Sequence, residues 1–204
     1  IGKRYKRYMK HPIARAIERS KSLVFRVLQE LQRQELVERT AGRPTYGLAF
    51  SVLEIGTAFL ARSDFMHSVQ SALRELSRAT EESVNLGVLR GSDVLYLAKH
   101  EGRNSVLTLS QVGGRVPASC TALGKAILAQ LPPADLEMVV PEPLPRLTSR
   151  SVGSVEELQR DLAGVRDRRW AFDDGEAVLG RCCVAVPVLL RGSGINFAAI
   201  SVSM

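Results

Sequence analysis

The spacing of apolar residues changes along this chain of 204 residues, and the change limits the folds that it can adopt. Up to about residue 82, apolar side chains recur mainly at intervals of three and four, as on one face of an α-helix. Residues 83–89 and 94–100 instead alternate around the turn at 91–93, which predicts a hairpin of two half-buried strands. Helices followed by paired strands indicate an α+β fold.

Residues 13–38 predict a short helix, a tight turn and a longer helix. The longer helix should begin at Ser20, because a serine side chain can accept a hydrogen bond from an unpaired amide of the first turn. Its apolar stripe contains Val24, Val27, Leu28 and Leu31. Its opposite face carries Ser22, Arg26, Gln29 and Arg33. Such a face suits a recognition helix in the major groove of DNA, although any amphipathic surface helix shows the same stripe.

Two short extended runs follow this helix, beginning at Val37 and at Thr45, with a turn at 42–44 between them. A helix pair followed by a small hairpin is typical of a winged helix-turn-helix. In that interpretation, Arg39 and Arg43 of the wing reach phosphate or the minor groove.

Positive charge is concentrated at the start of the chain. Residues 1–49 contain 12 Lys and Arg against 4 Asp and Glu, a net charge of +8. The remaining residues hold 16 of the chain's 28 basic residues and 17 of its 21 acidic ones, a net charge of −1. Because Lys and Arg supply most sequence-independent affinity for DNA, a nucleic-acid module joined to a neutral domain is predicted. A solvated basic tail or an arm on an anionic membrane surface is the alternative.

The sequence predicts a soluble, cytoplasmic protein. No apolar run approaches the roughly 20 residues that cross a bilayer, and the basic start lacks the apolar segment of a signal peptide. The cysteines are Cys120, Cys182 and Cys183, too few for a disulfide framework, which suits a reducing compartment.

A loop rich in glycine enters a helix near Thr121, and its small polar residues suggest an anion site. The first-turn amides of a helix favour an anion, and Ser119, Cys120 and Thr121 lie there. A Walker phosphate loop is a poor match, since Ser119 stands in place of its first glycine and Ala126 in place of its Ser or Thr.

The last third of the chain predicts one helix and three strands. Ser154 and Glu157 form a capping box that opens the helix, and residues 170–174 form a strand. Residues 182–190 and 195–204 are apolar strands that should pair as a central hairpin, with Pro187 at an edge or a bulge. The hydroxyls of Ser201 and Ser203, two residues apart, should point to one face.

These runs together resemble the IclR family of bacterial transcriptional regulators over nearly the whole chain. The matching segments are ARAIERSKSLVFRVLQELQRQELVER, TYGLAFSVLEIGTAFL, SCTALGKAILAQLP, RRWAFDDGEAVLGRCCVAVPV and FAAISVSM. The resemblance implies a winged helix-turn-helix at 1–49, a linker helix at 50–62, and at 63–204 an effector-binding domain with a GAF-like α/β fold and a curved antiparallel sheet. Residues 1–10 depart from the family, being shorter and more charged than its first apolar helix.

The resemblance also assigns residues to two sites. The DNA-facing start of the recognition helix would contain Ser20, Lys21, Ser22, Phe25 and Arg26. The effector pocket would contain Ala122, Leu123, Asp173, Cys183, Ser201 and Ser203. The implied partners are operator DNA, a small organic acid, and further copies of the chain in a homodimer or a dimer of dimers, with no membrane partner and no cofactor. Asp173 would repel a carboxylate, so it should accept a hydrogen bond from a ligand hydroxyl, a water or a side chain.

An enzyme that uses a thiol is the competing class. Cys120 or Cys183 with Asp173 and a histidine has the residue types of a nucleophilic site, but the three histidines do not point to one place in the sequence. Metal binding by Cys120, Cys183 and Asp173 lacks the usual ligand spacing, so no metal is predicted.

Overall fold

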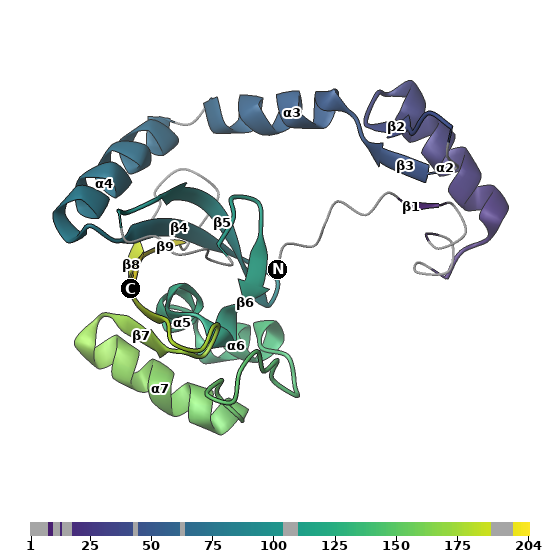
Figure 1. Cartoon of the computed structure of the whole chain (residues 1–204). Coiled ribbons are helices and arrows are strands. Elements are labelled where there is room, and N and C mark those ends of the chain that lie inside the picture. Colours follow the sequence, from purple (N-terminus) through teal and green to yellow (C-terminus); the bar gives the residue numbers. More distant parts are fainter. Residues whose placement is uncertain are drawn as a thin grey trace. The chain divides into compact units, whose positions relative to one another are not determined.

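A computed structural model describes residues 8–9, 13, 18–42, 45–61, 64–103, 110–188 and 198–204 (Figure 1). Contacts between Cα atoms divide the chain into two units, residues 1–68 and 69–204, which are described separately. Arg43, the turn expected at 191–194 and all but Ser110 of the strand expected at 104–110 lie outside the described residues. The division of the chain at 49 and 62 remains a prediction.

The first unit is built on helix α2, Lys21–Arg33, which begins as predicted. Ser20 is its N-cap, and the serine Oγ accepts a hydrogen bond from the amide of Leu23 at 3.3 Å. Val24 and Leu28 are buried, and the partly buried Ile13, Val37 and Tyr46 pack against them. Val24 and Leu28, one helical turn apart on the same face of α2, thus pack against the strands that follow.

The apolar stripe predicted for α2 is narrower in the structure. Val27 is 49% exposed, so the prediction that it belongs to the packed stripe is wrong. Residue 27 lies at the margin of the stripe, roughly 60° from Val24 around a helix with 3.6 residues per turn. The strands reach the side chains of Val24 and Leu28 and leave that margin uncovered.

Strands β2, Val37–Arg39, and β3, Thr45–Leu48, pair antiparallel and confirm the predicted hairpin. Strand β1, Tyr8–Met9, adds to the other edge of β3. Helix α3, Phe50–Ala61, follows directly, as expected. The hydroxyl of Ser51 donates to the carbonyl of Glu35, which ties the start of α3 to the turn after α2.

The second unit contains one antiparallel sheet with the order β6-β5-β4-β9-β8-β7. Its strands are β4, Ser83–Arg90; β5, Asp93–His100; β6, Arg115–Pro117; β7, Ala171–Asp174; β8, Cys182–Val188; and β9, Ala198–Ser203. The sheet curls around helix α5, Ala122–Leu128 (Figure 1). The boundary between the two units falls within helix α4, Asp64–Thr80. The part of α4 in the second unit precedes the sheet and buries Val69, Leu73 and Ser77.

The predicted hairpin of β4 and β5 forms, but β4 is not half-buried. Residues 83–88 are all buried, so the expected alternation is absent there, whereas β5 alternates. Gly87 adjoins a register shift in β4, and a Cβ at this position would lie 2.5 Å from Cγ1 of Val94 and 3.2 Å from Cδ1 of Leu123. A glycine here lets α5 approach the sheet closely.

Helix α5 is buried from end to end and lies in the main core. Gly124 permits this packing, because a Cβ would lie 2.1 Å from the carbonyl oxygen of Ala118 in the short helix η1, Ala118–Cys120. Helix α7, Val155–Arg168, contributes Leu158, Leu162 and Val165 to the same core. Helix α6, Pro133–Val139, adds Leu136.

Two local predictions for this unit are confirmed. Ser154 caps α7 by accepting from the amide of Glu157 at 3.2 Å, and Oε2 of Glu157 accepts from the amide of Gly153 at 2.8 Å. Strands β8 and β9 pair as expected. Pro187 lies beyond the segment of β8 that pairs with β7, which ends at Ala185, so β8 is an edge at the proline.

Candidate functional site

A cavity lies between the inner face of the sheet and the start of α5. Its volume is about 580 Å³ including the open mouth. The lining residues are Tyr96, Ser110, Val116, Thr121, Ala122, Leu123, Asp173, Ala177, Val178, Arg181, Cys183, Ser201 and Ser203. They come from both halves of the sheet, from α5 and from the loop between β7 and β8, so the cavity exists only in the folded unit.

The strand register explains why the polar residues of the cavity share one face. Ser203 is opposite Cys183 on β8, and Cys183 is opposite Asp173 on β7. On the other side, Ser201 is opposite Asn85 on β4. Directly paired residues of an antiparallel sheet point to the same side, so β7, β8 and β9 contribute polar lining groups to a single wall. Asn85 faces the same side from β4 but does not line the cavity.

Ser203 is the centre of a hydrogen-bonded group on this wall. Its Oγ accepts from Nδ2 of Asn85 at 3.2 Å and from Sγ of Cys183 at 3.3 Å. A hydroxyl has two acceptor lone pairs and one donor, so the proton of Ser203 remains able to donate to a ligand oxygen. Oδ1 of Asn85 is buried and has no hydrogen-bond partner within the described part of the chain.

Asp173 is 2% exposed and fixes the loop that follows β7. Its Oδ1 accepts from the amide of Glu176 at 2.7 Å. Burial raises the pKa of Asp173, while that backbone hydrogen bond and the nearby charge of Lys125 oppose the rise. Asp173 therefore serves as an anchor inside the protein before any ligand is considered.

Behind the cavity, a buried lysine binds two carboxylates. Nζ of Lys125 on α5 lies 2.5 Å from Oε1 of Glu176 and 2.7 Å from Oδ2 of Asp161 on α7. Burial raises the pKa of Glu176, and the hydrogen bond from Lys125 opposes this. The ammonium group joins α5, α7 and the loop after β7, so it holds the elements that build one side of the cavity.

Neither described cysteine of the competing enzyme hypothesis has the environment of a nucleophile. Burial raises the pKa of the Cys183 thiol to about 11, and a reactive cysteine needs a lowered value. Sγ of Cys120 donates to the carbonyl of Pro145 at 3.1 Å. Among the described residues, no three His, Cys, Asp or Glu side chains are grouped closely enough to hold a metal ion.

The structure brings most of the predicted pocket residues together. The predicted residues that line the cavity are Thr121, Ala122, Leu123, Asp173, Cys183, Ser201 and Ser203. Ser119 and Cys120 are buried in η1 and are not among its lining residues. The turn of η1 before Thr121 directs the thiol of Cys120 toward Pro145 instead.

Sequence reasoning missed Tyr96, Ser110, Val116, Ala177, Val178 and Arg181 as lining residues. The alternation of β5 could have indicated Tyr96, which faces the same side as Gly87. Burial raises the pKa of its phenol, so Tyr96 is a neutral hydrogen-bonding group. Arg181 lies in a loop without periodicity, where no local pattern shows the direction of its side chain.

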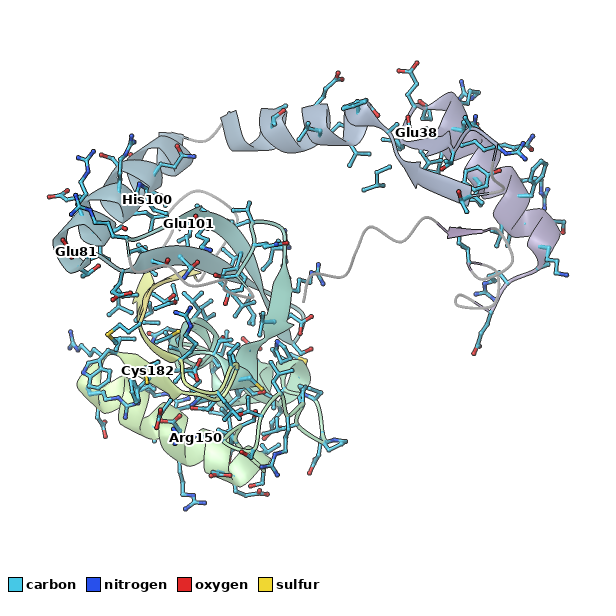
Figure 2. All side chains as sticks on the ribbon, viewed as in Figure 1. Glu38, Glu81, His100, Glu101, Arg150 and Cys182 are labelled. Atoms are coloured by element: carbon cyan, nitrogen blue, oxygen red, sulfur yellow. The ribbon has the colours of Figure 1, made fainter. Side chains whose placement is uncertain are left out.

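The residues predicted to face DNA lie on the outside of the first unit. Ser20, Lys21, Ser22, Phe25, Arg26, Gln29 and Arg39 are all exposed. Six of them are on or beside α2, on surface that the packed residues Val24 and Leu28 leave open. Arg39 ends β2, one residue after Glu38, which is labelled in Figure 2. Their exposure permits contact with a partner.

The fold defines a protein with an open pocket in a curled α+β unit. Comparison with known proteins gives its class. Residues 57–204 match the model of the bacterial transcriptional regulator IclR C-terminal domain. The chain is 35% identical to SauR of Cupriavidus necator over 193 residues, 94% of this chain and 76% of that protein. It is 31% identical to the HTH-type transcriptional regulator KdgR of Escherichia coli over 94% of this chain and 73% of KdgR.

A solved structure gives the same result for the fold. The crystal structure of IclR from Thermotoga maritima has a TM-score of 0.67 and 27% identity, and the match covers 98% of this chain and 81% of that chain. The protein is a transcriptional regulator, and it belongs to the IclR family. Its described helices include none with the length and hydrophobicity that a bilayer crossing requires.

Proposed function

We propose that the protein binds operator DNA through a winged helix-turn-helix at residues 1–49. The exposed face of α2 supports this proposal, because it presents Lys21, Ser22, Arg26 and Gln29 beside the N-cap Ser20. Basic and amide side chains are those that hydrogen-bond base edges in the major groove. Arg39 of β2 and the predicted wing residue Arg43 supply phosphate contacts next to the helix.

We further propose that a small organic acid binds in the cavity and changes the affinity for the operator. The observation that carries this proposal is a polar wall opposite the apolar residues of α5. The wall consists of the buried Asp173, Ser201 and Ser203 and the half-buried Cys183. A mostly apolar cavity with a few converging polar groups is the usual form of a small-molecule site. The hydroxyl proton of Ser203 can be donated to an acceptor oxygen, such as that of a carboxylate.

The two sites communicate, in this proposal, through the linker helix at residues 50–62 in a homodimer or a dimer of dimers. Two recognition helices then meet half-sites about one turn of DNA apart, so the spacing of the helices controls affinity. The effector needs only a difference in affinity for two arrangements of the protein, worth typically about 1–3 kcal/mol.

The DNA site is tested with Arg26→Ala in the full chain. Arg26 is exposed on α2, so the fold should not change, and specific operator binding should weaken by roughly 1–3 kcal/mol while non-specific binding changes less. Fluorescence anisotropy with operator and scrambled duplexes at several salt concentrations measures both. Equal loss on the two duplexes would make Arg26 a phosphate contact and remove it from base recognition.

The pocket is tested with the double variant Ser201→Ala and Ser203→Ala. Small organic acids are first screened for a rise in the melting temperature, since a ligand that binds only the folded state stabilises it by mass action. The double variant should remain folded and lose the ligand-induced change in operator affinity. A folded double variant with an unchanged response would remove this wall from the effector site.

A further inference from the structure

Among the described residues that line the cavity, Arg181 alone is always positively charged. Arg181 is the last residue of the loop between β7 and β8. Both its backbone amide and its backbone carbonyl form hydrogen bonds within this loop. Its amide donates to the carbonyl of Val178 at 3.1 Å, and its carbonyl accepts from the amide of Gly175 at 2.7 Å. The start of the side chain is therefore fixed beside the polar wall.

The described part of the chain leaves one donor of the Arg181 guanidinium group without a hydrogen bond. Nη2 of Arg181 is buried and has no hydrogen-bond partner in the described ranges, and no ion pair of Arg181 is found there. A buried donor on a charged group that lacks an acceptor is destabilising, and arginine cannot relieve this by losing its proton. The unfilled hydrogen bond thus marks a place for an oxygen from outside the chain.

The neighbouring acids are already engaged elsewhere. Asp173 holds the amide of Glu176, and Oδ2 of Asp174 pairs with Arg150 at 2.7 Å, on the exposed side of the loop. Figure 2 labels Arg150 and also Cys182, the residue that follows Arg181 in the chain. The positive charge of Arg181 instead acts on groups that line the cavity. Burial raises the pKa of Cys183, and the charge of Arg181 works against this rise.

We propose that Arg181 binds the carboxylate of the effector through Nη2 and thereby selects acids over neutral analogues. Ser203 donates its free proton to the same group or to a nearby oxygen, and the apolar residues Val116, Leu123 and Val178 receive the rest of the molecule. The inference rests on the proposed effector site and adds the residue that recognises the charge.

The test measures binding to the full chain by thermal shift over a range of concentrations. The probes are benzoate and hexanoate with their neutral counterparts benzamide and hexanamide. The variant Arg181→Met removes the charge at similar length, Arg181→Lys keeps the charge, and Arg160→Met, at an exposed position of α7, is the matched control.

At least one carboxylate should bind the wild type more tightly than its amide. Arg181→Met should weaken the carboxylate roughly 10- to 100-fold and leave the amide unchanged, Arg181→Lys should recover part of the affinity, and Arg160→Met should match the wild type. Without ligand, Arg181→Met should melt at or above the wild-type temperature, because an unsatisfied group has been removed.

Three results would overturn the inference. If carboxylates bind the wild type and Arg181→Met equally, the acidic effector stands and Arg181 does not recognise it. If Arg181→Met without ligand melts several degrees lower, Arg181 is a structural residue. If no carboxylate is preferred to its amide by the wild type, both the acidic effector and the role of Arg181 are refuted.

Discussion

Replacing Lys125 by Met should destabilise the protein more than any surface change of the same size. Lys125 is 1% exposed, and its ammonium group bridges Glu176 and Asp161 at 2.5 and 2.7 Å. Removing one partner of a buried ion pair costs about 3–5 kcal/mol. The side chain of Asp161 is 28% exposed and can be hydrated once Lys125 is removed, whereas that of Glu176 is 11% exposed and is left as an unpaired buried carboxylate. We therefore expect the free energy of unfolding to fall by about 3 kcal/mol. This loss corresponds to a melting temperature roughly 6–12 °C lower.

The loss should depend on pH with a sign that the structure determines. Burial raises the pKa of Glu176, and removing Lys125 removes the interactions that oppose the rise. When the pKa of a carboxyl is higher in the folded state than in the unfolded state, the folded state binds the proton more tightly. The carboxyl then contributes its full stabilisation of the folded state below the unfolded pKa of about 4.3. This stabilisation is lost as the pH rises through the folded-state pKa. The deficit of Lys125→Met should therefore be smaller at pH 5 than at pH 8.

Urea unfolding of the wild type, Lys125→Met and the double variant Lys125→Met, Glu176→Gln at both pH values measures this. The double variant lacks the uncompensated carboxylate, so it should regain part of the stability at pH 8 and lose most of the pH dependence. A deficit below about 1 kcal/mol, or one that is the same at the two pH values in both variants, would refute the reasoning.

Two further predictions concern packing and thiol chemistry. Gly124→Ala should lower the free energy of unfolding by about 3 kcal/mol, because its Cβ would overlap the backbone of Ala118. The control Gly56→Ala in α3, where a Cβ would have nothing within 4 Å, should be neutral or stabilising by up to about 1 kcal/mol. Urea unfolding measures both variants, and equal effects would contradict the packing of Gly124 against Ala118. Because the pKa of Cys183 is about 11, only about one thiol in a thousand is ionised at pH 8. Iodoacetamide labelling followed by peptide mass spectrometry should therefore find Cys183 at least about 100-fold slower than free cysteine. Rapid labelling of the folded protein would contradict the raised pKa.

Several elements of the fold could be predicted because their signals are local. The N-cap Ser20 and the capping residues Ser154 and Glu157 act on amides within three or four positions, so a short stretch contains all the information. The alternation of β5 and the spacing of Ser201 and Ser203 likewise follow from strand geometry alone. The resemblance to the IclR family added the order of these elements.

Other features depend on which elements pack together. Val27 has the spacing of a packed residue but is exposed, and β4 lacks alternation because its residues 83–88 are all buried. Cys120 precedes the helix that borders the cavity, yet its thiol bonds to Pro145. Each outcome is decided by a neighbour that is distant in the sequence, which apolar spacing does not identify.

The sequence by itself determined that a basic amphipathic helix precedes paired strands, and which of their residues could share a face. Only the tertiary structure decided that Lys125 is a buried cation. It also decided that Arg181, which lines the cavity with Ser203 and Cys183, has a buried donor without a partner among the described residues. Helix and strand periodicity are properties of neighbouring residues. Burial of a charge depends instead on sheet order and register, which join residues more than 50 positions apart in the chain.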